Sequence, residues 1–207
     1  MTTEIATVLF DLGGVVCRFH PERRLGALAA DCGLPEVEVR ARVWDSGFDH
    51  RCDQGKYPAR QVYEEIQTFL GLKATYAEFS RLWGLAFEPD PSVLAIVDRL
   101  RSAVRVGLLT DNGPVLREAM PVLFPDIAIR FEPMLFSCEF GALKPTAELF
   151  AAVLERLSQR AEQILLVDDS PRVVRGATEV GLRACLYTCA EALRRELAGY
   201  GLHLGPA

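Results

Sequence analysis

The feature of this sequence that most constrains its fold is a series of short, continuous apolar runs. They recur at residues 6–10, 104–109, 134–136, 164–167 and 182–187, and a small or acidic residue closes each of them. Continuous runs of this length are typical of strands buried on both faces, whereas half-buried strands alternate apolar and polar residues. The runs therefore predict the strands of a parallel sheet.

Helical patterns lie between the later runs. Residues 91–100 begin with Pro91, which suits the first turn of a helix, and their apolar residues recur at helical spacing. Residues 147–157 and 171–181 show a similar pattern, and the second of these ends at Gly181. Alternating strands and helices predict an α/β fold in which helices cover both faces of a parallel sheet.

The first connection departs from this alternation. No second run typical of a strand appears between residues 10 and 104. Helical patterns fill that interval instead, at residues 22–30, 36–44, 59–70 and 76–86. We therefore expect a core formed by residues 1–17 and 89–207, with a small helical cap formed by residues 18–88.

Polar side chains follow three of the predicted strands. Asp11 follows the first run, Thr110 follows the second, and Asp168 and Asp169 follow the run at 164–167. Lys144 lies in a turn-rich stretch after the run at 134–136. Ligands of open parallel sheets bind at the carboxyl ends of the strands, so these side chains are expected to form one site.

The residue types of this expected site indicate its chemistry. Carboxylates gathered at a buried edge repel each other, and oxygen ligands suit Mg²⁺. A cation beside Lys144 favours an anionic substrate, and a phosphate monoester attacked by one Asp fits best. Gly13 and Gly14 follow Asp11 and allow the backbone to turn sharply and approach the ligand.

Composition excludes several other functions. The 207 residues include 23 Lys and Arg against 28 Asp and Glu, for a net charge of −5, and contain no basic run that would follow a nucleic-acid backbone. No apolar run approaches the length of a membrane span, and the N-terminal residues lack the pattern of a signal peptide. We expect a cytoplasmic protein that binds neither nucleic acid nor membrane; the sequence leaves monomer and dimer open.

Cysteine usage fits a reducing compartment. The six cysteines are scattered and form no C-x-x-C pair, so we expect them to be reduced. A metal site formed by Cys185, Cys189 and His203, or a catalytic thiol, is the alternative. A single C-x-x-x-C pair without a second cysteine pair argues against it.

Four segments together resemble the motifs of the haloacid dehalogenase-like (HAD) hydrolase superfamily. They are Asp11-Leu-Gly-Gly-Val, Thr110, Lys144-Pro145 and Asp168-Asp169-Ser170-Pro171. The resemblance covers the whole chain and is strongest for the sugar-phosphate phosphatases that include α-D-glucose-1-phosphatase, which share the Asp-Leu-Gly opening and a cap segment similar to residues 48–56. It implies a Rossmann-like sheet of strand order 3-2-1-4-5.

The resemblance also implies roles for individual residues. Asp11 would be the nucleophile that forms an aspartyl-phosphate and would also bind Mg²⁺. The backbone carbonyl of Gly13 and the carboxylate of Asp169, with Asp168 beside it, would complete the protein ligands of the metal.

The phosphate group has its own expected partners. The Thr110 hydroxyl and the backbone amide of Asp111 would bind the phosphate, and Lys144 would bridge the nucleophile and the phosphoryl group.

Three residues depart from the family pattern. Many family phosphatases have a second Asp two residues after the nucleophile as general acid and base, where this chain has Gly13. Val173 replaces the Asp or Asn usually found four residues beyond the metal-binding Asp, and Asp111 replaces a frequent Asn. The leaving group therefore has no named proton donor, metal binding is expected to be weaker or completed by water, and the Asp111 side chain should point away from the phosphate.

Residues of the expected cap could take part in the site. His20 or His50 could supply the missing proton, and Arg51 or Lys56 could contact a sugar phosphate, although ordinary structural and surface roles are the favoured explanation of these residues.

We predict a Mg²⁺-dependent phosphatase that acts on small phosphorylated metabolites, with sugar phosphates as the favoured substrates. One alternative is a metal-free 2-haloacid dehalogenase, whose relatives also lack the second Asp. The other is a degenerate member that binds a phosphorylated ligand or a partner protein without turnover.

Overall fold

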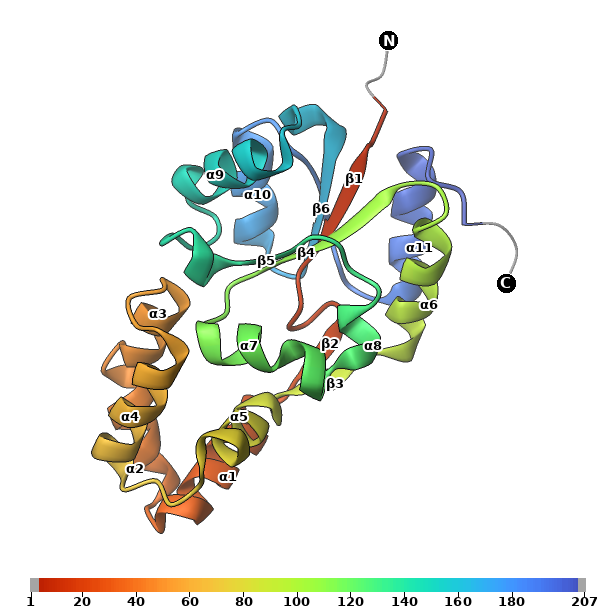
Figure 1. Cartoon of the computed structure of the whole chain (residues 1–207). Helices are drawn as coiled ribbons and strands as arrows, with labels where there is room; N and C mark the ends of the chain where they lie inside the picture. The colour runs from red at the N-terminus through yellow and green to blue at the C-terminus, as the bar shows by residue number, and fades with distance from the viewer. Residues whose placement is uncertain (1–3, 205–207) are drawn as a thin grey trace.

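The computed structural model describes residues 4–204, and its centre is a five-stranded parallel sheet (Figure 1). Its strands are β1 (Thr7–Phe10), β4 (Arg105–Thr110), β5 (Met134–Phe136), β6 (Ile164–Asp168) and β7 (Arg183–Leu186). They are arranged in the order β5-β4-β1-β6-β7, which is 3-2-1-4-5 when only these strands are counted. The α/β fold and its parallel sheet are confirmed; residues 1–3 and 205–207 of the expected core lie outside the described residues.

Helices cover both faces of this sheet. Alternate strand residues supply the two faces: Leu9 packs with α9 (Ala147–Leu157) and α10 (Pro171–Glu179), whereas Val8 packs in the cluster that contains α6 (Pro91–Leu100) and α11 (Ala190–Gly199). The two short helices α7 (Pro114–Leu123) and α8 (Pro125–Ala128) follow β4. All four residues of β1 are buried, as expected for a central strand of this kind.

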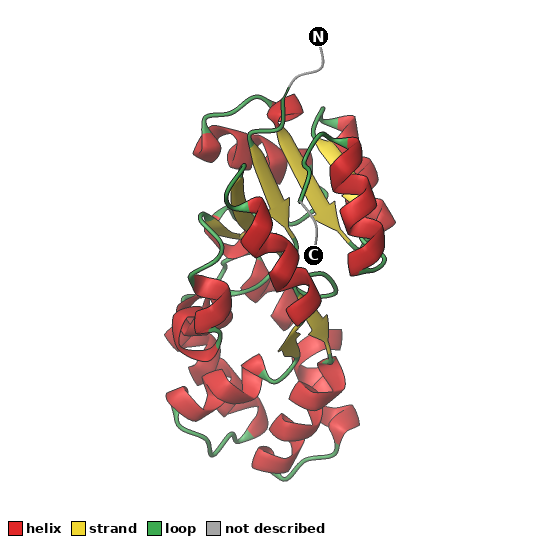
Figure 2. Ribbon diagram, turned by 90° about the vertical axis from the view of Figure 1, so that its right-hand side faces the viewer, coloured by secondary structure: helices red, strands yellow, loops and turns green. Residues whose placement is uncertain are grey.

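A group of helices lies apart from the sheet, beyond the carboxyl ends of its strands (Figure 2). We call residues 20–86 the helical insert. It contains α1 (Pro21–Cys32), α2 (Glu36–Arg40), a π-helix (Ala41–Asp45), α3 (Phe48–Asp53), α4 (Ala59–Leu70) and α5 (Tyr76–Gly84). Helix α4 matches the prediction at both ends, whereas the single helix expected at residues 36–44 is an α-helix followed by a π-helix.

Two short strands connect the insert to the rest of the chain. Strands β2 (Cys17–Phe19) and β3 (Phe87–Pro89) pair in an antiparallel manner. The expectation of no strand between residues 10 and 104 was therefore wrong. Each strand has three residues, too few to give a periodic pattern, and Arg18 and Phe19 are exposed.

The helical insert also contacts the segment that directly follows strand β5. The Ser137 hydroxyl, just after β5, donates a hydrogen bond of 2.7 Å to the backbone carbonyl of Asp53 in α3. Gly55 has a φ of +68°, and a Cβ atom there would lie 2.0 Å from the carbonyl oxygen of Cys138. Only glycine permits this close approach, which fixes α3 over the strand ends.

No helix among residues 4–204 combines the length and the apolar character needed to cross a membrane.

Candidate active site

The strand ends bring the predicted polar residues together. Phe10 pairs with Val167 across neighbouring strands, so Asp11 and Asp168 emerge side by side. The Asp11 backbone N–H donates to the Val167 carbonyl oxygen at 2.9 Å and holds the chain at this edge. Both residues line a cavity of about 430 Å³ between the sheet and the helical insert, together with Thr110 and Lys144.

Lys144 connects the two carboxylates. Its Nζ lies 2.9 Å from Asp11 Oδ1 and 2.6 Å from Asp168 Oδ2, and the residue is only 4% exposed. The Lys144 backbone N–H donates to both carboxylate oxygens of Asp111, at 3.1 and 3.2 Å. These two bonds hold the Asp111 side chain against the loop that contains Lys144.

Burial and charge set the ionisation of this cluster. Burial raises the pKa of Asp11 to about 6, although the neighbouring Lys144 ammonium acts in the opposite direction. Burial alone would lower the pKa of Lys144, but Asp11, Asp168 and Asp111 outweigh it and raise that pKa. Burial and the neighbouring Asp168 raise the pKa of Asp169. One buried ammonium therefore faces an excess of carboxylates, a charge balance that a cation would improve.

Three carboxylates could hold that cation. Asp11, Asp168 and Asp169 each offer an oxygen, and these oxygens lie within 4.8 Å of one another. An all-oxygen set of this kind suits Mg²⁺. The carboxylate of Asp169 lies against Gly14, where φ is +85° and a Cβ atom would lie 2.1 Å from Asp169 Oδ2.

Val173 offers no ligand to this cluster. Its side chain is buried in the apolar layer between the sheet and helices α9 and α10, and the residue also lines the cavity. The position that often carries an Asp or Asn is therefore apolar.

A second set of polar atoms surrounds the end of β4. Thr110 is buried, and its Oγ1 accepts a hydrogen bond of 2.7 Å from the side-chain amide of Asn112. That bond leaves the hydroxyl hydrogen of Thr110 available for another acceptor. Sequence reasoning missed Asn112, although its position two residues past the strand-end hydroxyl was a usable signal.

Gly13 has an apolar environment. A Cβ atom at this position would lie 3.4 Å from the ring of Phe87 and 3.5 Å from that of Phe19. These two rings pack together with their centres 5.3 Å apart. The surroundings of the position that often carries a second Asp are thus aromatic.

The histidines and basic residues proposed from the sequence lie outside the lining of the cavity that contains Asp11. His20 is 3.2 Å from Glu22, and His50 lines a neighbouring cavity of about 700 Å³ that also contacts Lys144. Arg51 bonds with the Tyr57 hydroxyl, and Lys56 is exposed. Within residues 4–204, none of these four side chains lines the 430 Å³ cavity.

Cysteine residues do not form a site. All six cysteines are free. Within the described ranges, the acidic group of Asp11, Asp168 and Asp169 is the one cluster able to hold a metal, so Cys185, Cys189 and His203 are not gathered.

Sequence reasoning named other residues of the insert and missed the ones that line the cavity. Arg24, Trp44, Asp49 and Asp53 line it from α1, the π-helix and α3. The i, i+4 spacing of Asp49 and Asp53 places them on one face of a helix, but no pattern in the sequence indicates what that face meets.

Known proteins resemble this chain in sequence pattern and in fold. A family model for haloacid dehalogenase-like hydrolases matches residues 5–181. A predicted HAD-like family hydrolase from Porphyromonas gingivalis has a similar structure, with a TM-score of 0.78 and 23% identity over 94% of this chain and 98% of that one.

Two further structures share the fold. The HAD family enzyme bt-2542 from Bacteroides thetaiotaomicron, solved with magnesium and inorganic phosphate, has a TM-score of 0.75 and 20% identity over 89% of this chain and 94% of that one. L-2-haloacid dehalogenase from Xanthobacter autotrophicus has a TM-score of 0.61 and 20% identity over 94% of this chain and 83% of that one. With the family model spanning most of its length and the motif residues meeting at one sheet edge, this chain belongs to the haloacid dehalogenase-like hydrolases.

Proposed function

We propose that the protein is a Mg²⁺-dependent phosphatase that removes phosphate from small phosphorylated metabolites, with sugar phosphates as the favoured class. The observation that carries this proposal is that Asp11 lies beside the Lys144 ammonium and is grouped with the carboxylates of Asp168 and Asp169. A nucleophile, a fixed cation and an all-oxygen metal site are what phosphoryl transfer to a carboxylate requires.

In the proposed reaction, an Asp11 oxygen attacks phosphorus and forms an aspartyl-phosphate. The bond from phosphorus to the ester oxygen breaks, and the leaving alkoxide takes a proton from solvent water, since Gly13 offers no side-chain donor. Water then attacks the phosphorus of the intermediate and gives up a proton to solvent, the bond to Asp11 breaks, and inorganic phosphate leaves. Lys144 stays fixed by Asp168 and stabilises charge on the transferring oxygens.

The metal would be held by Asp11, the backbone carbonyl of Gly13 and Asp169, with Asp168 as a possible second carboxylate of the site. Bound there, Mg²⁺ would neutralise phosphate charge and orient the group. Asp168 is already occupied by Lys144 and by the Ser170 backbone N–H at 2.9 Å, which favours a supporting role for it.

The phosphate oxygens would be bound by the Thr110 hydroxyl, the backbone amide of Asp111 and Lys144. Thr110 is held by Asn112, and Asp111 by the Lys144 backbone, so these donors are already oriented.

The helical segment at residues 18–88 is proposed as a cap over a core formed by residues 1–17 and 89–207. Its support is the paired strands β2 and β3 at its ends and the cavity that it shares with the sheet. We also propose a cytoplasmic location. The six free cysteines support it, because the cytoplasm keeps thiols reduced.

A metal-free haloacid dehalogenase is the second candidate. The neighbour from Xanthobacter autotrophicus and the absence of an acid at Gly13 favour it. Attack on carbon needs no cation, however, and would not explain why the Asp169 carboxylate is grouped with those of Asp11 and Asp168. That grouping favours the phosphatase.

The test is a metabolite screen with the purified protein. Phosphate release from a panel of phosphorylated sugars, polyols and acids is measured with Mg²⁺ and with EDTA. We expect release that depends on Mg²⁺. Chloride release from a 2-haloacid that persists in EDTA would reverse the ranking, and thermal stabilisation by phosphate esters without turnover would indicate a degenerate, binding member.

A further inference from the structure

Phe19 is the one exposed aromatic side chain among residues 4–204. It ends strand β2 and is 47% exposed, whereas its cross-strand partner Phe87 is buried. Covering an exposed ring removes apolar surface from water and is favourable. What can cover Phe19 depends on where its ring lies in the fold.

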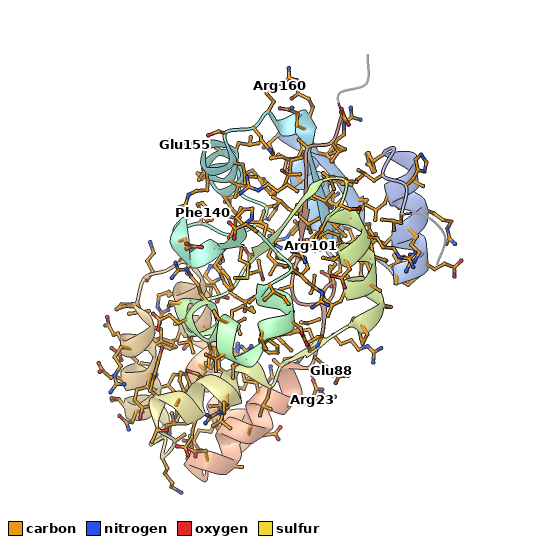
Figure 3. All side chains as sticks on the ribbon, turned by 45° about the vertical axis from the view of Figure 1, so that its right-hand side comes forward. Arg23, Glu88, Arg101, Phe140, Glu155 and Arg160 are labelled. Atoms are coloured by element: carbon orange, nitrogen blue, oxygen red, sulfur yellow. The ribbon has the colours of Figure 1, made fainter. Side chains whose placement is uncertain are left out.

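The pairing of β2 with β3 determines where the ring lies. Residues of a strand alternate between its two faces, and direct cross-strand partners share a face. Arg18 and Glu88 are partners on one face, and Glu88 also pairs with Arg23 at 2.6 Å, at the edge of the molecule (Figure 3). Phe19 and Phe87 are partners on the other face, and both line the active-site cavity. The strand pair therefore presents its aromatic face to the cavity.

The ring of Phe19 also lies close to the proposed nucleophile. A Cβ atom at Gly13, two residues after Asp11, would lie only 3.5 Å from this ring. Asp11 and Phe19 line the same cavity of about 430 Å³. The leaving group of a phosphate ester held at Asp11 can therefore reach the ring.

The helical insert adds a further ring to this surface. Trp44 lines the cavity, and its ring stacks on that of Trp83 with the centres 6.2 Å apart. The guanidinium of Arg24 lies over the ring of Trp83 at 4.5 Å and over that of Phe87 at 5.4 Å. Packed side chains thus connect the three rings that line the cavity. We call Phe19, Phe87 and Trp44 the aromatic wall.

The chemistry of the aromatic wall favours one shape of leaving group. A sugar ring presents C–H groups on part of its surface, and an aryl group presents its flat face. Either can cover the ring of Phe19 without separating a hydroxyl from water. An open-chain polyol carries hydroxyls along its whole length, so covering the ring with it would desolvate some of them.

We propose that Phe19 is a specificity-determining residue whose exposed ring packs against the apolar face of a cyclic leaving group, with Trp44 and Phe87 extending the contact. The inference rests on the proposed phosphatase function and deepens it. It divides the phosphorylated metabolites by the shape of the leaving group, and it favours esters of cyclic alcohols over esters of open-chain polyols.

The substrate side of the test uses the unmodified protein. Glucose 6-phosphate and sorbitol 6-phosphate both release a primary alcohol, but only the first contains a ring. Their hydrolysis is compared at saturating Mg²⁺. We expect kcat/KM to be about tenfold higher for glucose 6-phosphate. Equal values, or a preference for sorbitol 6-phosphate, would overturn the inference.

The protein side uses Phe19→Ala and Phe19→Leu, with Ile129→Ala as the control. Ile129, just after helix α8, is exposed and apolar but is not among the described residues that line the cavity. Alanine removes the ring, and leucine keeps apolar bulk without a flat face. The readout is the ratio of kcat/KM for phenyl phosphate to that for acetyl phosphate, whose small leaving group has no ring.

Intrinsic reactivity of the two esters cancels when each variant is compared with the unmodified protein. We expect this ratio to fall about three- to tenfold in Phe19→Ala and about twofold in Phe19→Leu. In Ile129→Ala it should stay unchanged.

Three results separate the possible failures. An unchanged ratio in a folded Phe19→Ala protein, even with lower activity on both esters, contradicts the role of Phe19 while the phosphatase function stands. Should Phe19→Ala not fold, Phe19→Leu replaces it, and an unchanged ratio there contradicts packing against the ring. Failure of the unmodified protein to hydrolyse any of the four esters refutes the proposed function, and the inference with it.

Discussion

The two sides of the active-site cavity differ in how far their polar groups are satisfied. On the sheet side, Lys144 contacts two carboxylates and Asp168 accepts from both Lys144 and Ser170. On the side of the helical insert, Arg24 has two buried donors without partners. The comparison indicates that the polar groups at the strand ends hold one another in place, whereas the guanidinium of Arg24 is held by the rings of Trp83 and Phe87.

The largest effect should come from the sheet side. Replacing Asp11 with Asn removes the proposed nucleophile but keeps its size, so we expect phosphate release to fall by about a thousandfold or more. The assay is steady-state release from the best ester of the screen. Asp126→Asn, an exposed residue in α8, is the matched control and should leave the rate unchanged. If Asp11→Asn retained full activity, Asp11 would not be the nucleophile, and the reaction would not be carried out by the residues at the strand ends.

Lys144 should affect stability as well as turnover. Lys144→Met leaves the buried Asp11 and Asp168 carboxylates without their ammonium, which is expected to lower the free energy of unfolding by about 3–5 kcal/mol. Urea denaturation in EDTA measures this loss. Lys56→Met, at an exposed position of the insert, provides the control. A loss no larger than in that control would mean that the carboxylates do not depend on Lys144.

The pH dependence of stability isolates Asp11. Its pKa is about 6 in the folded protein against 3.8 as its ordinary value, so the folded state disfavours the ionised form. The stabilising contribution is complete below pH 4 and is lost as the pH rises to about 6, a change of about 3 kcal/mol. We expect this loss in metal-free protein and its absence in Asp11→Asn.

The measurement is the difference in unfolding free energy between the two proteins from pH 4 to pH 7. Mg²⁺ should reduce the loss, because it binds the ionised carboxylates. A difference that is flat across this range would contradict the raised pKa.

Gly14 should have the smallest of these effects. In Gly14→Ala the new Cβ would overlap Asp169 Oδ2 at a positive φ, so Asp169 must move and Mg²⁺ affinity should fall about ten- to hundredfold. Activation by Mg²⁺ at increasing concentration measures the affinity. Gly199→Ala is the control, since nothing lies within 4 Å of that position. Unchanged activation would exclude Asp169 from the metal site.

The sheet side was also the more predictable from sequence. A strand buried on both faces needs a continuous apolar run, so the five runs located the strands to within one residue, and their ends located Asp11, Thr110 and Asp168. Because the strands are parallel, their carboxyl ends lie at the same edge of the sheet, which brings these three residues together.

The insert side could not be predicted in the same way. Helical periodicity located α4 at both ends, but periodicity says which face is apolar and not what that face meets. The neighbours of Arg24 depend on how α1 packs against Trp83 and Phe87, which lie more than fifty residues away in sequence. Strands β2 and β3 escaped notice because three residues cannot show a period.

The short pairing of β2 with β3 has a consequence for how such a protein can change over time. Phe19 and Phe87 are direct partners, so the two ends of the helical insert lie about 5 Å apart. A segment whose ends are adjacent can be lengthened, shortened or exchanged with little disturbance to the chain that receives it. The carboxylates at the strand ends can therefore stay unchanged while the insert, and with it the lining that it contributes to the cavity, is replaced.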